Sequence, residues 1–178
     1  MSRFHQASVI VPSPIGPLGL SASPRGLTRL DFLGSETVFS EEGTATGAEE
    51  SAILAEAARQ LEAYFAGSLR QFELPLDLSG TAFQQRAWKA IGRVPFGEVV
   101  SYADIAGAAG NPKAYRAAGA ACGANPVAIV IPCHRIVGSD KALHGFGGGL
   151  DVKRWLLAHE GVADVRLPAQ RRLTAALV

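Results

Sequence analysis

With 178 residues, of which 48% are hydrophobic, the sequence is long enough for one large domain or two small ones around a packed core. Its two cysteines, Cys122 and Cys133, exclude a disulfide framework and a multi-cysteine zinc site. The net charge of +1 is unevenly divided: residues 1–79 hold 5 Lys and Arg against 10 Asp and Glu, and residues 80–178 hold 12 against 6. Only the second half therefore suits phosphate binding, unless the arginines of its tail are simply solvated.

Short strands are predicted for the first third of the chain. The runs ASVIV, PLGLSA and LTRLDFL are rich in strand-forming residues and are bounded by Pro, Gly and Ser, as in a small antiparallel sheet. Residues 34–47 separate the third run from the next element, and we expect them to form a surface loop.

A helix is predicted to follow this loop and to pack against the strands. It begins near Glu49 and stops at Gly67, because apolar and aromatic residues recur between them at helical spacing, namely Ile53, Ala57, Leu61, Tyr64 and Phe65. Residues 67–79 form a connector with one more short extended segment. The sequence therefore predicts a small N-terminal α/β domain with an antiparallel sheet over residues 1–79.

The second half predicts a mainly helical C-terminal domain over residues 80–178, which ends in a tail. Thr81 is a candidate N-cap for its first helix, whose expected inner face consists of Phe83, Ala87, Trp88 and Ile91. Two short helices are expected next, one from about Tyr102 to Ala109 and one with Asn111 as N-cap and Pro112 in its first position. This pair has helix-turn-helix character.

The second helix of this pair has almost no side-chain bulk, because Ala and Gly fill positions 117–121. Such a helix is most often packed tightly in a core. Arg116 favours another environment, since a long cation among small residues suits a DNA groove better than a core. Asn125 and Pro126 then end the helix and turn the chain toward Cys133.

The stretch IPCHR, residues 131–135, sets a cysteine directly beside a histidine after a rigid proline. A free thiol is mostly protonated at neutral pH, so a neighbouring base marks a reactive cysteine. In an extended segment consecutive side chains point to opposite faces, so Cys133 and His134 would meet across a turn or through a bridging water, and we favour the water. A buried structural cysteine beside a surface histidine is the alternative.

The surroundings of this stretch resemble a known family. Together with IPCHR, the upstream segment GNPKAYRAAGAACGANPVAIV and the downstream segment HGFGGGLDVKRWLLAHEG resemble the active-site region of the O6-alkylguanine-DNA alkyltransferases, the methylated-DNA-protein-cysteine methyltransferases. The resemblance extends from about Thr81 to Gly161. It implies direct DNA repair by irreversible, single-turnover transfer of an alkyl group from O6-alkylguanine, with O4-alkylthymine left open as a second substrate.

The resemblance implies a role for each residue of the reactive centre. Cys133 matches the nucleophile, and His134 and Glu160 match the residues that complete a cysteine, water, histidine, glutamate relay. Tyr102 matches the tyrosine that crowds the target phosphate and donates its proton to the departing guanine, and Asn125 matches the asparagine that braces the turn under the site. Without the family pattern, a solvated Glu160 and a packing role for Tyr102 are the ordinary interpretations.

Double-stranded DNA that carries the lesion is the partner implied by the resemblance. Arg116 matches the family's arginine finger, which occupies the place of the flipped base. The helix-turn-helix would enter the minor groove, and the residues expected to contact DNA are Tyr102, Arg116, Ala117, Gly119 and Ala120.

The glycine-rich segment 145–149 corresponds to the family's loop over the alkyl pocket. We expect this pocket to be lined by Val130, Phe146, Gly147 and Gly148. The family commonly has a tyrosine and then Ser or Ala where this chain has Phe146 and Gly147, so a phenolic hydroxyl and a donor to guanine O6 are missing. Ala128 stands where some relatives have a proline that stacks on benzyl groups, which leaves sensitivity to benzylguanine inhibitors open.

We expect neither a cofactor nor a metal, because the first half lacks the cysteines with which some relatives bind zinc. The absence of a bilayer-spanning apolar run and of an apolar signal region predicts a soluble cytoplasmic protein. No heptad pattern requires a second subunit, so a monomer is expected. Two other classes remain open: a non-catalytic lesion-binding protein, against which Cys133 argues, and a cysteine hydrolase, whose local signature is absent.

Overall fold

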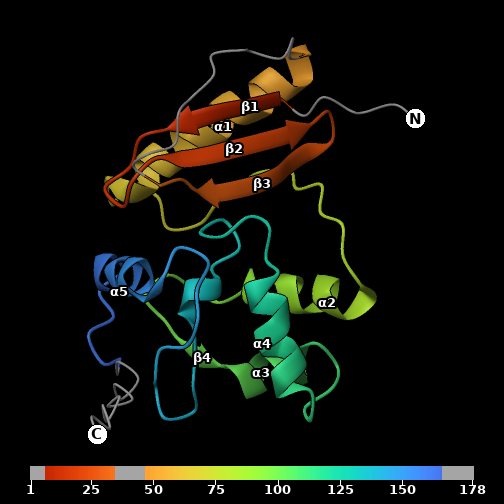
Figure 1. Cartoon of the computed structure of the whole chain (residues 1–178), viewed down its shortest axis with the longest axis vertical. Helices are drawn as coiled ribbons and strands as arrows, with labels where there is room; N and C mark the ends of the chain where they lie inside the picture. Colours follow the sequence, from red (N-terminus) through yellow and green to blue (C-terminus); the bar gives the residue numbers. More distant parts are fainter. Residues whose placement is uncertain (1–6, 35–46, 166–178) are drawn as a thin grey trace, which may run out of the picture.

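The computed structural model describes residues 7–34 and 47–165, which form two lobes (Figure 1). The N-terminal lobe is an antiparallel sheet with strand order β1-β2-β3, and one helix packs against it. Its elements are β1 (Ala7–Val11), β2 (Leu18–Ser23), β3 (Gly26–Phe32) and α1 (Ala48–Phe65). These strands and this helix confirm the predicted N-terminal elements. The predicted loop 34–47 and the C-terminal tail lie largely outside the described residues.

The core of the N-terminal lobe follows the two periodicities of its elements. Along β2 buried residues alternate with half-buried ones, so that Leu18, Leu20 and Ala22 face α1 and the core. From α1 the buried side chains include Ala57, Leu61 and Tyr64, which lie on the predicted inner face. Within the described ranges, no helix is both long enough and apolar enough to cross a bilayer.

The C-terminal lobe is built from helices joined by short irregular segments. Its elements are α2 (Ala82–Ile91), β4 (Val100–Ser101), α3 (Tyr102–Ala108), α4 (Tyr115–Gly123), the 3-10 helix η1 (Cys133–Arg135), β5 (Ile136–Val137) and α5 (Leu150–His159). The Thr81 hydroxyl accepts a hydrogen bond from the Gln84 amide, and the Gln84 side chain accepts one from the Thr81 amide, which confirms the predicted cap of α2. Strands β4 and β5 pair in parallel and were not predicted, because each has only two residues.

The start of α4 corrects the sequence prediction. The helix begins at Tyr115, not at Pro112, because Asn111 serves the end of α3 instead of the start of α4. Gly110 has a φ of +87°, its amide donates to Gly107 O at 2.9 Å, and the Asn111 amide donates to Ala106 O at 2.9 Å. These two bonds form a Schellman motif at the end of α3. Asn111 is thereby part of the turn between the helices.

Strand β3 holds the two lobes together along its free edge. The Leu27 amide donates to Pro75 O at 2.8 Å, so the connector lies beside the first half of the strand. Farther along, the Leu30 amide donates to Pro126 O at 2.8 Å. One hydrophobic cluster extends from the sheet through α2 to the residues around Cys133. The segment that leads from Pro126 to Cys133 is therefore anchored on the N-terminal sheet.

We predict that Gly26→Ala destabilises the protein by about 1 to 3 kcal/mol, because a methyl group there would lie 2.6 Å from the backbone carbon and oxygen of Pro75. The control is Gly107→Ala in α3, where no atom lies within 4 Å of the added carbon and alanine has the higher helix propensity. Urea unfolding measures both. Equal stability of Gly26→Ala and wild type would mean that the connector can move away from β3 without loss.

Candidate active site

Cys133 opens the 3-10 helix η1 and is 5% exposed. The segment is therefore a turn. It is not extended, so the rule that consecutive side chains point to opposite faces does not apply to Cys133 and His134. Asn125 holds the turn: its side-chain nitrogen donates to Ile131 O at 2.8 Å and to the Cys133 sulfur at 3.1 Å, while its oxygen accepts from the Val127 amide at 3.1 Å. One amide side chain thus fixes both the turn and the thiol.

His134 is fully buried beside the cysteine and is paired with Glu160. Its Nε2 lies 2.8 Å from Oε1 of Glu160. A carboxylate only accepts hydrogen bonds, so Nε2 carries the proton and Nδ1 of the neutral ring is an acceptor. Nδ1 is buried and has no hydrogen-bond partner among the described residues. The histidine is therefore oriented as a base whose accepting nitrogen is not engaged by any of those residues.

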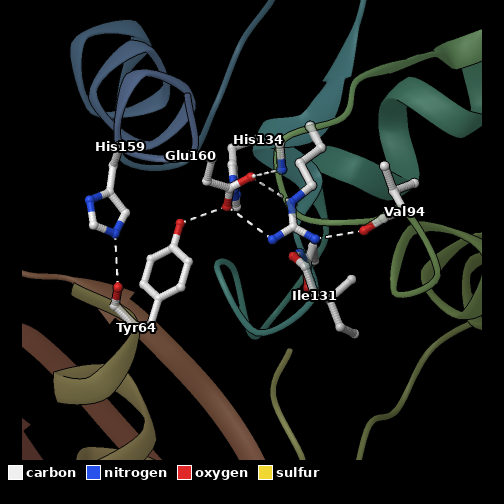
Figure 2. A network of polar contacts seen from close by, with 9 residues as sticks. Tyr64, Val94, Ile131, His134, His159 and Glu160 are labelled. Atoms are coloured by element: carbon white, nitrogen blue, oxygen red, sulfur yellow. Dashed lines mark hydrogen bonds and ion pairs between the residues drawn. The ribbon is translucent and has the colours of Figure 1, made fainter. Parts of the chain in front are cut away.

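Glu160 lies at the centre of a network of donors (Figure 2). Arg135 donates to both of its oxygens, from Nε at 2.8 Å and from a terminal nitrogen at 2.9 Å, and its other terminal nitrogen donates to Val94 O at 2.6 Å. The Tyr64 hydroxyl donates to Oε1 at 2.7 Å, and the Gly97 amide donates to Oε2 at 3.3 Å. The carboxylate therefore has a paired positive charge and a full set of donors although it is buried.

The protonation states follow from this burial. Burial raises the pKa of the Cys133 thiol, although the hydrogen bond from Asn125 and the charge of Lys153 act in the opposite direction. Burial lowers the pKa of His134, against the pull of Glu160. For Glu160, burial alone would raise the pKa, but the hydrogen bonds and charges of His134 and Arg135 outweigh it and hold it below its ordinary value. At neutral pH the site therefore contains a thiol, a neutral imidazole and a carboxylate.

Lys153 is a buried cation close to Cys133. It projects from α5, is 1% exposed, and donates to Ile136 O at 2.7 Å and His144 O at 3.2 Å. Burial lowers its pKa, and negative charge on either cysteine would raise it. Its ammonium lies 6.0 Å from the ring centroid of Tyr102, whose own pKa is raised to about 12 by burial and, at the high pH where the thiols ionise, by Cys122 and Cys133. Tyr102 therefore remains a proton donor at neutral pH.

Four of the predicted DNA-contact residues lie on α4, and the fifth, Tyr102, begins α3. Arg116, Ala117 and Ala120 are exposed, whereas Ala118, Ala121 and Cys122 form the buried face. Gly119 is half-buried, and a methyl group there would lie 3.8 Å from the Tyr102 ring. The core-packing interpretation of this small-residue helix is therefore confirmed for its buried face, and DNA contact stays a prediction for its exposed face. The exposed face offers close backbone approach beside one long cation.

The predicted pocket residues are only partly brought together. The Phe146 ring packs between His134, at a centroid distance of 6.4 Å, and Phe32 of β3, at 5.3 Å. Gly148 lies against the same Phe32 ring, and Gly147 has open space around it. Val130 instead lines two hollows beside the connector and α2, and neither of them is lined by the glycine-rich loop.

The comparisons with known families now bear directly on this site. Residues 82–162 match the DNA-binding domain of 6-O-methylguanine DNA methyltransferase, and residues 9–78 match the ribonuclease-like domain of the same protein. A methylated-DNA–protein-cysteine methyltransferase of Methanosarcina barkeri is 49% identical over 151 residues, which are 85% of this chain and 94% of that protein. The chain belongs to the 6-O-methylguanine DNA methyltransferase family. It is thus identified as a methylated-DNA–protein-cysteine methyltransferase.

Other members of the family agree in sequence and fold. The methylated-DNA–protein-cysteine methyltransferase of Mycobacterium tuberculosis is 47% identical over 150 residues, 84% of this chain and 89% of that protein. The crystal structure of M. tuberculosis OGT in complex with DNA superposes with a TM-score of 0.75 at 44% identity, and covers 86% of this chain and 92% of that one. These likenesses show the same mixed α/β fold in both lobes.

Three residues of the network were missed by the sequence reasoning. Lys153 gave a usable signal, because it shares the apolar face of α5 with Leu156 and Leu157, where a cation needs a buried partner. Tyr64 was placed on an inner helix face, where a hydroxyl must find an acceptor. Arg135 gave no such signal, since a residue beside His134 can equally point to solvent.

We predict that the protein loses stability as the pH falls from about 6.5. The folded pKa values of His134 and Glu160 lie below their ordinary values of 6.5 and 4.5, so the unfolded chain binds these protons first. The contribution of His134 is therefore complete above pH 6.5 and that of Glu160 above pH 4.5, and each declines as the pH falls below that value. Glu160→Gln should cost about 3 to 5 kcal/mol at pH 7, because it leaves Arg135 unpaired, and should flatten the loss between pH 5 and 3.

Urea unfolding at several pH values measures this effect, with the exposed Glu98→Gln as control. If Glu160→Gln and Glu98→Gln lost stability in parallel from pH 7 to pH 3, the buried carboxylate would not be the group that responds to acid.

Proposed function

We propose that the chain repairs DNA by moving an alkyl group from O6-alkylguanine to Sγ of Cys133, once per molecule. The family assignment gives the coarser activity, DNA repair by alkyl transfer to a protein cysteine. The observation that supports the transfer to Cys133 is the hydrogen-bonded pair of His134 and Glu160. Glu160 fixes the proton of His134 on Nε2 and leaves Nδ1 to accept another. That is the arrangement a base needs in order to activate a buried thiol.

The transfer proceeds by displacement at the alkyl carbon. The thiol proton passes through a water to Nδ1 of His134, and the thiolate, stabilised by Lys153 and the Asn125 amide, attacks the carbon bound to O6. The carbon–oxygen bond breaks as the sulfur–carbon bond forms, and the electron pair remains on guanine. Tyr102 donates its hydroxyl proton to the guanine and takes one back from solvent, while the imidazolium of His134 releases the proton that it took from sulfur, so both residues return to their starting states. The products are guanine and a thioether.

The proposal that the protein acts once rests on the chemistry of this product. A thioether is a poor leaving group, and the hydrogen bonds of the described residues hold no second nucleophile against the Cys133 sulfur. Each chain therefore acts as a reagent as well as a catalyst. O4-alkylthymine presents a similar oxygen-bound alkyl group, and we propose it as a second substrate.

Duplex DNA is the proposed partner, bound by a single chain through α4. M. tuberculosis OGT is known in complex with DNA, and the matched C-terminal region carries the family's DNA-binding domain. We place the flipped nucleotide between Tyr102, Phe146 and the glycine-rich loop, with Arg116 in the stack, and α4 in the minor groove. The boundary between the two domains is placed at residue 79, within the connector that follows α1.

We predict that Cys133 and not Cys122 carries the adduct after incubation with DNA containing O6-methylguanine. Both thiols are buried, but Cys122 faces the packed side of α4 and has its pKa raised to about 12 by burial, then by Cys133. Peptide mapping by mass spectrometry locates the methyl group, and Cys133→Ser should abolish transfer while Cys122→Ser retains it. Methyl groups on Cys122, or more than one lesion repaired per chain, would contradict the proposal.

We predict that Arg116→Ala slows repair of duplex DNA by at least about tenfold, because base extrusion costs on the order of a few kcal/mol and the finger offsets part of it. Reaction with free O6-benzylguanine, where accepted, should change little, since a free base needs no extrusion. A lesion placed opposite an abasic site should partly rescue the variant. Single-turnover kinetics on the three substrates measure these effects.

The matched control is Lys113→Ala, which removes a nearby exposed cation outside α4. It should weaken duplex binding without slowing repair at saturating protein. The slope of the logarithm of the binding constant against the logarithm of the salt concentration should become shallower by about one. If Arg116→Ala behaved in the same way, Arg116 would be a phosphate contact and not the finger.

A further inference from the structure

Tyr64 brings the N-terminal lobe into the reactive centre. It lies in the last turn of α1, far from Cys133 in sequence, yet its hydroxyl donates to Oε1 of Glu160 at 2.7 Å (Figure 2). The other donors that the structure gives Glu160 come from the C-terminal lobe, namely Gly97, His134 and Arg135. The N-terminal lobe, to which the sequence assigned no chemistry, therefore contacts the carboxylate that orients the base.

The position of this hydroxyl is fixed by packing. Tyr64 is fully buried, and its ring is surrounded by aromatic rings at centroid distances of 5.1 to 6.2 Å, those of Phe65, Phe72, Phe96 and His159. Nε2 of His159 donates to the Tyr64 carbonyl at 2.8 Å, which ties the end of α5 to the same residue. Burial, followed by the charge of Glu160, raises the pKa of Tyr64, so the hydroxyl remains a donor. It cannot swing away without opening this aromatic cluster.

The hydroxyl shares one carboxylate oxygen with His134. Oε1 of Glu160 accepts from Tyr64, from Nε2 of His134 and from Arg135. Each neutral donor makes a carboxylate a weaker base and so reduces its stabilisation of the imidazolium form of His134. We propose that Tyr64 is a positioning residue of the transfer reaction, whose hydroxyl holds Glu160 in place and keeps His134 a neutral base. This inference rests on the proposed roles of Cys133 and His134.

The other charged groups around Glu160 and His134 do not take over the role of the Tyr64 hydroxyl. Arg135 on η1 and Lys153 on α5 both disfavour a charged His134, and the Cys133 thiol is neutral at rest. Arg135 is already committed to Glu160 and to the Val94 carbonyl, and Lys153 to two other carbonyls. Loss of the Tyr64 hydroxyl would therefore leave Oε1 with two donors and a stronger interaction with His134.

The test is the pH dependence of single-turnover transfer from O6-methylguanine duplex DNA by Tyr64→Phe, which removes only the hydroxyl. The acid limb of the profile should move to higher pH by about half to one unit, because His134 then binds a proton more readily. On that limb, the rate relative to the variant's own plateau should fall about three- to tenfold below wild type. Phe65→Leu is the control, since it disturbs the same cluster without touching Glu160, and its limb should not move.

A nitrogen-15 NMR titration of His134 separates this inference from the proposed function, because it needs no substrate. Tyr64→Phe should raise the pH at which Nδ1 becomes protonated, whereas 3-fluorotyrosine at position 64, a stronger donor of almost the same shape, should lower it. The fluorinated protein also decides the question if Tyr64→Phe fails to fold. An unchanged titration in the folded variants, or an equal shift in Phe65→Leu, would overturn the role of Tyr64. Failure of Cys133 to accept a methyl group would overturn only the proposed function.

Discussion

The buried carboxylate of Glu160 is the interaction on which the rest of the site depends. It accepts five hydrogen bonds from four residues, which come from α1, η1 and the loop before β4. A buried charge costs several kcal/mol unless it is paired and hydrogen-bonded. Those donors must therefore be in place together, and the carboxylate at the end of α5 sets where each of the three segments can lie. The orientation of His134 follows from that constraint.

Arg135 joins the buried carboxylate of Glu160 to the turn that contains Cys133. It follows Cys133 and His134 in η1, pairs bidentately with Glu160 and donates to the Val94 carbonyl after α2. The short 3-10 turn makes this possible, because it lets Cys133 meet Asn125 while His134 and Arg135 both reach Glu160. On the opposite side Asn125 holds the thiol, and the adjoining Pro126 is bonded to β3. The reactive turn is therefore held by both lobes.

Much of this architecture could be predicted from local sequence signals, and the exceptions have physical causes. Runs of strand-forming residues between turn residues located β1 to β3, helical periodicity located α1 and α2, and Thr81 as a candidate N-cap marked the start of α2. The start of α4 was predicted wrongly from Asn111 and Pro112, because a capping signal does not say which of two adjacent helices it belongs to. In the site, the resemblance identified Cys133, His134 and Glu160, which the structure places side by side. Tyr64 and Lys153 could be recognised as residues that need a buried partner, but the partner could not be named, since it is a backbone carbonyl or a residue distant in sequence.

Under the proposed single-turnover mechanism, the protonation states explain how Cys133 stays unreacted until a substrate is bound. Burial holds Cys133 as a thiol and His134 as a neutral ring, so the resting site has no thiolate to react with stray electrophiles. Proton transfer from sulfur to imidazole separates charge in a buried site, where it is costly unless opposite charges are already placed nearby. Lys153 lies near the sulfur, and Glu160 is bonded to the imidazole. Each new charge is therefore stabilised where it forms, and the thiolate needs to exist only when an alkylated base is in position to consume it.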